Sequence, residues 1–98
     1  MEEEQTAVRV DQWLWAVRLF KTRSLAASAC RKGQVHVAET TVKPSRLVRK
    51  GDQVWVKRQY LTVRLEVLDV LQHRVGAKLV PDYAKDVTPE EDIERAKA

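Results

Sequence analysis

The sequence predicts an α+β fold, with a helical hairpin packed on a small, mostly antiparallel sheet and a short C-terminal helix. Two patterns along the chain lead to this prediction. From residue 10 to residue 30 apolar residues recur every three or four positions, which is typical of α-helices. From residue 34 to residue 67 they alternate with polar residues, which is typical of strands. A chain of 98 residues suits one small domain with a single core.

Two short helices are expected in the first third of the chain. Asp11 can cap the first helix, which is predicted to end at about Lys21. Its apolar face is formed by Val10, Trp13, Leu14, Val17 and Phe20. Ser24 is the candidate cap of the second helix, and Gly33 stands where a left-handed residue can end it. The apolar residues of this second helix are Leu25, Ala26, Ala29 and Cys30, most of them small enough for close packing.

The alternating region predicts strands at residues 34–37 and 53–57 and a longer core strand at residues 61–67. Lys50-Gly51-Asp52 is a turn signal between strands. Val75 to Val80 is expected to add one more short strand, which Pro81 ends.

The two ends of the chain differ from its middle. Residues 1–7 are acidic and polar, and we expect a disordered tail there. Residues 86–98 are expected to contain the last helix, with Thr88 as its cap and Pro89 as its first helical residue. The sequence shows no repeat and no interdomain linker.

Composition argues against several classes of protein. The single cysteine, Cys30, allows no internal disulfide, and with only His36 and His73 beside it the sequence has no recognisable metal-ligand set. No catalytic constellation is apparent either, so we expect a non-enzymatic protein without a cofactor. The N-terminus lacks an apolar run, which predicts a soluble cytoplasmic protein without a membrane partner.

The positive charge is concentrated in the middle of the chain. Residues 9–58 contain twelve basic residues and three acidic ones, whereas both flanks are acidic, and the whole chain has a net charge of +4. Such a basic region is typical of surfaces that bind polyanions, because neutralised phosphates release counterions. The alternative is that these residues are ordinary solvated charges.

Several of the cations surround the joint between the two expected helices. Arg18 and Lys21 are three residues apart and would be neighbours on the first helix. Arg23 would lie in the turn before Ser24, where free amides and the helix dipole favour a phosphate. Arg31 and Lys32 would end the second helix, where the alternative is that they only complement its dipole.

These residues resemble a known family. RVDQWLWAVRLFKTRSLAASACRKGQVHV, followed by VKPSRLVRKGDQV, is similar to the S-four-type RNA-binding domain, and within that family to the small ribosome-associated heat-shock proteins of bacteria. The motif R-x-D-x-W-L-W-x-x-R-x-x-K-T-R-S-x-A carries the resemblance, together with Gly33, Lys43-Pro44-Ser45 and Gly51-Asp52 in the same order. The resemblance is close over residues 9–58 and assigns an RNA-binding domain to residues 8–85.

The resemblance implies a fold, a partner and a role. It implies an alpha-L helical hairpin that binds ribosomal RNA on the large ribosomal subunit as a monomer. The role it implies is rescue, recycling or quality control of large subunits that carry peptidyl-tRNA, as part of a stress response. With the residues of the joint, the expected RNA-binding set is Arg9, Arg18, Lys21, Thr22, Arg23, Ser24, Arg31, Lys32, Lys43, Ser45 and Arg46.

Within residues 9–58 the sequence departs from the family pattern in two places. Gln12 replaces the lysine that usually follows the aspartate, which removes one charge. Ala38-Glu39-Thr40 replaces the usual Asn-Gly turn, and since these residues do not readily take a positive φ, we expect a different or longer turn.

Other readings remain open. The chain could be the RNA-targeting module of an RNA-modifying enzyme, or a partner of one, although no catalytic domain follows it. A helix-turn-helix that binds DNA is a weaker alternative, because the second helix is short and rich in alanine. Trp55 and Tyr60 flank the Lys57-Arg58 pair, so they could stack on bases, yet aromatic residues are also common in strands.

Overall fold

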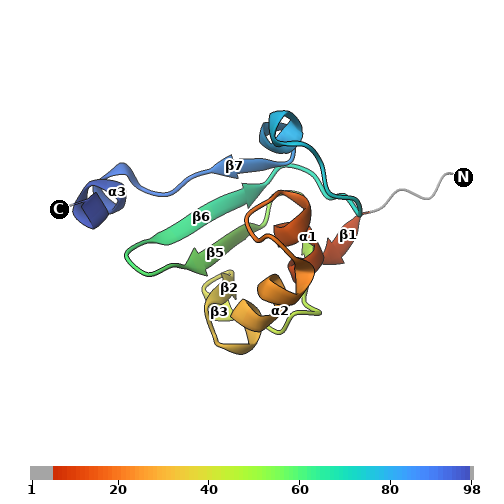
Figure 1. The fold of residues 1–98 in the computed structure, drawn as a ribbon, viewed down its shortest axis with the longest axis horizontal. Coiled ribbons are helices and arrows are strands. Elements are labelled where there is room, and N and C mark those ends of the chain that lie inside the picture. The colour runs from red at the N-terminus through yellow and green to blue at the C-terminus, as the bar shows by residue number, and fades with distance from the viewer. Residues whose placement is uncertain (1–5, 98) are drawn as a thin grey trace, which may run out of the picture.

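Two antiparallel sheets and a pair of short helices form the body of the protein, which a computed structural model describes for residues 6–97 (Figure 1). The α+β fold is therefore confirmed. The elements in chain order are β1 (Ala7–Arg9), α1 (Val10–Ala16), α2 (Arg23–Arg31), β2 (Val35–Val37), β3 (Thr40–Thr41), β4 (Leu47–Arg49), β5 (Gln53–Lys57), β6 (Thr62–Val67), the 3-10 helix η1 (Ala77–Asp82), β7 (Ala84–Asp86) and α3 (Glu90–Lys97). Most of the expected N-terminal tail, residues 1–5, lies outside the described residues. Ala7, which was expected to belong to that tail, instead pairs with Arg49.

The first helix is shorter than predicted. It ends at Ala16 rather than at about Lys21, because Arg18 adopts a left-handed conformation with φ 67°. The amide of Arg18 donates to the Trp15 carbonyl and the next amide donates to the Leu14 carbonyl, both at 3.0 Å. These two bonds are those of a Schellman motif, which normally has glycine at the left-handed position.

The cap of the second helix lies two residues earlier than predicted. Its cap is Thr22, whose hydroxyl accepts the Leu25 amide at 3.1 Å, so the prediction of Ser24 as the cap is wrong. Thr22 has the extended backbone that a cap needs, with φ −137° and ψ 159°. In the resulting helix Leu25 is 51% exposed, whereas the alanines and Cys30 are buried.

The end of the second helix is as predicted. Gly33 has φ 76°, and its amide donates to the Cys30 carbonyl at 3.0 Å. The following amide, of Gln34, donates to the Ala29 carbonyl at 3.0 Å. Both helices therefore end in the same motif, once with glycine and once with arginine.

The larger sheet has the strand order β3-β2-β5-β6-β7, and β1 pairs with β4 in a separate two-stranded sheet. The strands predicted around residues 35–37, 53–57 and 62–67 are all present as β2, β5 and β6. The predicted turn is also present, with Gly51 at φ 96° between β4 and β5. The sequence pattern did not reveal β1, β3, β4 and β7, which have only two or three residues and show little alternation. The equally short β2 was predicted because Val35 and Val37 alternate with Gln34 and His36.

The turn between β2 and β3 contradicts the prediction. Val37 pairs with Thr40, so only Ala38 and Glu39 form the loop. Both take a positive φ, 54° and 65°. This is the two-residue turn geometry that Asn-Gly normally provides. Alanine and glutamate adopt its left-handed backbone at a cost in conformational free energy.

The region after β6 also differs from the prediction. Residues 77–82 form η1 instead of a strand, with Pro81 inside it, since the fixed φ of proline is compatible with a 3-10 turn. The Thr88 hydroxyl, expected to cap the last helix, accepts the Arg64 amide at 2.9 Å and so ties this segment to β6. The first residue of α3 is Glu90 rather than Pro89.

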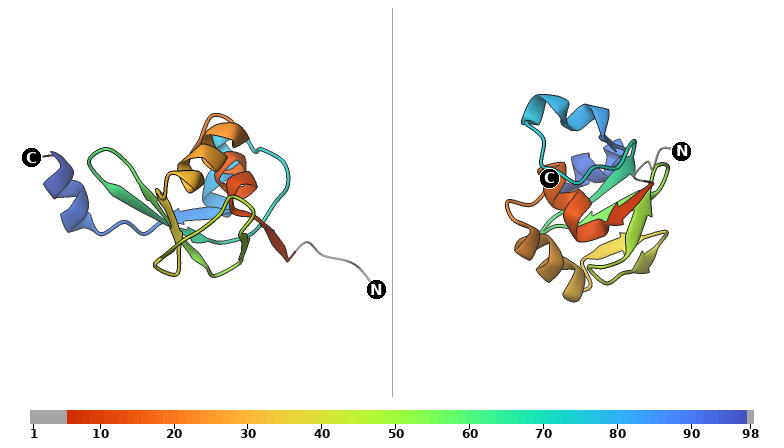
Figure 2. Two further views of the ribbon diagram at one scale, coloured as in Figure 1. Left: turned by 90° about the horizontal axis from the view of Figure 1, so that it is seen from below. Right: turned by 90° about the vertical axis from the view of Figure 1, so that its right-hand side faces the viewer.

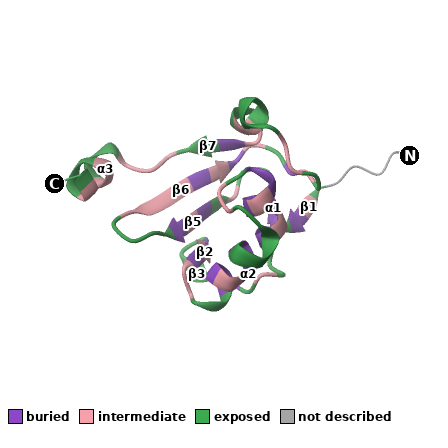
Figure 3. Ribbon diagram, viewed as in Figure 1, coloured by how far each residue is buried: buried purple, intermediate pink, exposed green. Residues whose placement is uncertain are grey.

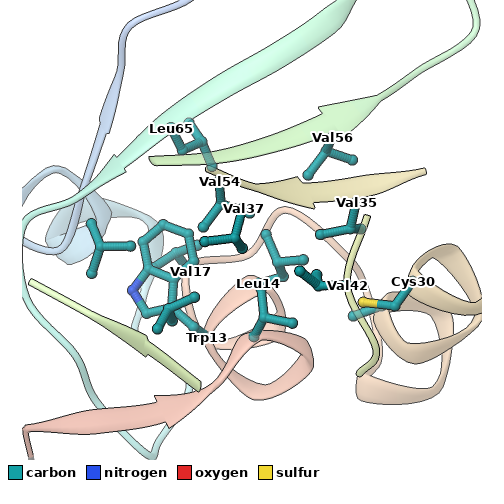
Figure 4. Packing of buried hydrophobic residues seen from close by; sticks show 14 of the residues in the cluster. Trp13, Leu14, Val17, Cys30, Val35, Val37, Val42, Val54, Val56 and Leu65 are labelled. Atoms are coloured by element: carbon teal, nitrogen blue, oxygen red, sulfur yellow. The ribbon is translucent and has the colours of Figure 1, made fainter. Parts of the chain in front are cut away.

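The helices α1 and α2 cover one face of the larger sheet, and the core lies between them (Figure 2). Buried residues follow the inner sides of α1, α2, β2 and β5 (Figure 3). Trp13 and Leu14 are fully buried against valines of the sheet (Figure 4). Truncating such a tryptophan costs about 3–5 kcal/mol, so Trp13 stabilises the fold and is not available to RNA bases.

Candidate nucleic-acid interface

All eleven residues predicted to bind RNA are exposed. They come from four parts of the fold: the end of β1, the loop between α1 and α2, α2 itself with the residue after it, and the loop between β3 and β4. Exposure is necessary for a binding role. It does not test that role, which therefore stays a prediction.

A buried carboxylate brings two of the predicted arginines together. Asp11 is only 3% exposed. Arg9 donates to both of its oxygens, from Nε at 3.1 Å and from Nη2 at 3.0 Å, and Arg23 Nη2 lies 3.7 Å from Oδ1. The prediction that Asp11 caps α1 is wrong, because the cap position is Arg9 and no side chain caps there. The bidentate geometry fixes one guanidinium group next to the other, and two cations against one anion leave net positive charge.

The loop at residues 43–46 lies against the beginning of α1. The amide of Val10 donates to the Arg46 carbonyl at 2.7 Å, and the Asp11 amide donates to the Pro44 carbonyl at 3.4 Å. Arg9 pairs with Leu47 across β1 and β4. The backbone thus places Arg46 close to Arg9, although the two are far apart in the sequence.

A hollow joins this loop to the C-terminal end of α2. Arg31 lines it from α2, and Lys43 lines it from the loop. Lys43 also lines an adjoining hollow together with Ser45 and Arg46. Four of the predicted residues therefore share one continuous concave surface.

The N-terminus of α2 offers further donors. Arg23 is the first residue of the helix rather than a residue of the preceding turn. The Thr22 hydroxyl accepts a hydrogen bond from the Leu25 amide. The amides of Arg23 and Ser24 lie in the first turn of the helix, at its N-terminus. The helix dipole makes this end attractive to an anion. Lys21 is exposed immediately before it.

Arg18 lies apart from these residues. The prediction that it neighbours Lys21 on a helix is wrong, because α1 has ended before either residue. Its Nη1 donates to the Val75 carbonyl at 3.3 Å. Within residues 6–97, the ion pairs of Asp11 are with Arg9 and Arg23, and Arg18 is not among its partners.

Two arginines that were not among the predicted site residues hold the loop between the helices. Arg58 Nη2 donates to the Leu19 carbonyl at 2.8 Å, and its guanidinium lies 4.9 Å from the centre of the Phe20 ring. Arg74 donates to the Trp15 carbonyl at 3.2 Å and to the Phe20 carbonyl at 3.3 Å. The two arginines thus supply hydrogen-bond donors to carbonyls of the loop and of the last turn of α1. The sequence offered only the basic Lys57-Arg58 pair as a signal.

The remaining aromatic residues differ in availability. Trp55 is half-buried, with the Arg64 guanidinium 4.1 Å from its ring centre and its indole N–H donating to Gln53 at 2.9 Å. Tyr60, in contrast, is 75% exposed at the β5–β6 hairpin. Trp55 is thus engaged by protein groups, while Tyr60 remains open to solvent.

The described residues offer neither a metal-ligand cluster nor a reactive thiol. Among them no group of three potential ligands could hold a metal ion. Burial, and secondarily the nearby charge of Asp11, raise the pKa of the Cys30 thiol to about 11, so it is a poor nucleophile at neutral pH. No helix within residues 6–97 is long and apolar enough to span a bilayer.

Comparison with known proteins points to one family. The model of the S4 domain matches residues 8–54. The chain is 42% identical to the heat shock protein 15 homolog of Aeromonas salmonicida over 79 residues, which cover 79% of this chain and 58% of that protein. It is 32% identical to the RQC P-site tRNA stabilizing factor of Listeria innocua over 66 residues, which cover 65% of this chain and 72% of that protein.

A solved structure has the same fold. It is the trimeric structure of heat shock protein 15 from Vibrio cholerae, with a TM-score of 0.80 and 30% identity. The match covers 93% of this chain and 90% of that one. By contrast, the chain spans little more than half the length of the curated Aeromonas relative.

Proposed function

Because the chain belongs to the S4 domain family and is related within it to heat shock protein 15, we propose that it binds structured ribosomal RNA on the large ribosomal subunit without catalysing a reaction. In this proposal residues 8–85 form the RNA-binding unit, and the C-terminal segment at residues 86–98 lies outside it. The protein would work in the cytoplasm, where ribosomes are.

One observation carries the proposal: the pair of arginines on the buried carboxylate. Asp11 pairs with Arg9 and Arg23, and both arginine side chains remain nearly half exposed, at 47% and 44%. The guanidinium N–H groups of Arg9 and Arg23 that Asp11 does not engage are suited to phosphate oxygens. The exposed Arg46 lies beside them on the docked loop. This supports recognition of a phosphate backbone.

The names of the relatives support a more specific role. The Listeria relative is named for stabilising a tRNA in the P site, and others are named as heat shock proteins. We propose that this chain acts on large subunits that carry peptidyl-tRNA, in rescue, recycling or quality control. We further propose that it binds as a monomer, whereas the Vibrio cholerae structure is trimeric.

The test is to measure the affinity of the full chain for isolated bacterial large ribosomal subunits, with and without bound peptidyl-tRNA. Affinity should fall about 10³-fold or more between about 50 and 200 mM salt if several phosphates are contacted. Tighter binding to occupied subunits supports the specific role, and equal binding removes it but leaves RNA binding. An affinity that does not change with salt would contradict phosphate recognition altogether.

A further inference from the structure

A series of hollows runs around the C-terminal end of α2. The first is lined by residues 41–43 with Ser45 and Arg46, and the second by Arg31 and residues 41–44. The second shares Gly33 with a third hollow, which lies between the end of α2 and the end of β5. The basic residues that line the three hollows are Arg46, Lys43, Arg31, Lys32, Lys57 and Arg58. No aspartate or glutamate lines any of the three.

Hydrogen bonds fix the segments that line the third hollow. The Lys57 amide donates to the Gln34 carbonyl at 2.7 Å, which joins β5 to the segment after α2. Arg58 is fixed by its bond to the Leu19 carbonyl. Lys32 and Lys57 are both exposed, and within residues 6–97 neither forms an ion pair with a carboxylate. Their charges are therefore available to a ligand.

We propose that the third hollow is a second phosphate-binding site for RNA, in which Lys32, Lys57 and Arg58 contact the ribose-phosphate backbone. The backbone of the bound RNA would follow the hollows from the loop at residues 43–46, past the end of α2, to the β5–β6 hairpin. This inference rests on the proposed function and extends it beyond the helix pair. A concave surface whose charged lining residues are all basic concentrates phosphate groups, because no carboxylate in the lining offsets its potential.

The neighbouring hollow on the far side of the hairpin does not continue this path. It is lined by Tyr60, Arg64 and Arg95, but also by Asp92, whose carboxylate lies 3.7 Å from Arg64 and 3.9 Å from Arg95. The charges there are already paired within the protein. The path of the phosphates therefore ends at the hairpin.

The experiment compares two double variants of the full chain. Lys32→Ala/Lys57→Ala removes the two unpaired cations of the third hollow, and Lys78→Ala/Lys85→Ala removes two exposed lysines of η1 and β7 that line none of the three hollows. Binding to isolated bacterial large subunits, and to RNA extracted from them, is measured over a salt series. Arg58 is left unchanged, because its bond to the loop between the helices makes its loss a folding risk.

We expect Lys32→Ala/Lys57→Ala to weaken binding about tenfold and to lower the slope of log affinity against log salt by about 1 for each lysine. The control variant should match the wild type in both quantities. A third variant, Arg23→Ala, changes the helix-pair site outside the hollows. If Arg23→Ala weakens binding while the two double variants behave alike, the second site is wrong and the proposed function stands. If the wild-type chain itself does not bind, both proposals fall.

Discussion

At the scale of single residues, the sequence proposed a set of RNA-binding candidates but not how their side chains are arranged. The predicted set is exposed throughout, because charged side chains in a small basic domain stay in water. The role of Asp11 was missed, since an aspartate near the start of a helix is ordinarily read as its cap. Its partner Arg23 is twelve positions away and comes from another helix. No local pattern could have revealed that contact.

The buried carboxylate gives a prediction about stability. We expect Asp11→Asn to lower the free energy of unfolding by about 1–3 kcal/mol, because an amide of the same shape cannot accept two charge-assisted bonds from Arg9. Urea unfolding of the variant and the wild type measures the difference. The matched control is Asp82→Asn, which makes the same charge change at an exposed residue and should stay within about 0.5 kcal/mol of the wild type. Equal midpoints for the two variants would show that the cluster contributes nothing to the fold.

At the scale of elements, the sequence predicted the helices α1, α2 and α3 and the strands β2, β5 and β6, but it misplaced several of their boundaries. Periodicity could not place the end of α1, since the apolar pattern continues to Phe20 while the backbone has already turned at Arg18. The prediction for the Ala38-Glu39 turn failed for a similar reason, because the residue preferences of alanine and glutamate indicated a different or longer turn. In both places a non-glycine residue adopts positive φ, at a cost of about 1–2 kcal/mol. The rest of the fold imposes a backbone that the local sequence disfavours.

Two substitutions at Arg18 can separate its left-handed backbone conformation from its predicted contact with RNA. Arg18→Gly relieves the left-handed backbone and should raise the free energy of unfolding by about 1 kcal/mol relative to Arg18→Ala, which keeps a Cβ. Both variants lose the same charge. If Arg18 contacts RNA, both should bind large subunits more weakly than the wild type and to the same extent. Thermal unfolding and subunit binding measure the two effects independently. If Arg18→Gly were no more stable than Arg18→Ala, the left-handed backbone at this position would not be strained.

At the scale of the whole molecule, positive and negative charge are separated along its length. The described chain measures 52 × 27 × 23 Å, with α3 at one end of the long axis and β1 toward the other (Figure 1). The basic residues at positions 9–58 come from β1, the helix pair and the strands and loops as far as the residue after β5. In contrast, α3 carries Glu90, Glu91 and Asp92 in its first turn. An acidic helix could either shield the basic surface or stay away from it. The ion pair of Asp92 with Arg64 holds α3 at the outer part of β6.

This arrangement predicts that the acidic helix has little influence on RNA binding. Glu90→Gln/Glu91→Gln should change the affinity for large subunits by less than about twofold, because both residues are exposed, line none of the three basic hollows, and are screened by salt. Asp92 is left intact so that its ion pair with Arg64 continues to hold the helix. Removing the same amount of charge from the basic surface with Arg46→Gln/Lys43→Gln should weaken binding about tenfold. If the glutamine variant of α3 instead bound several-fold more tightly at low salt and equally at high salt, then α3 would reach the basic surface in solution. The separation of charge seen here would then be only one of the states of the molecule, and the helix would act as a competitor of RNA.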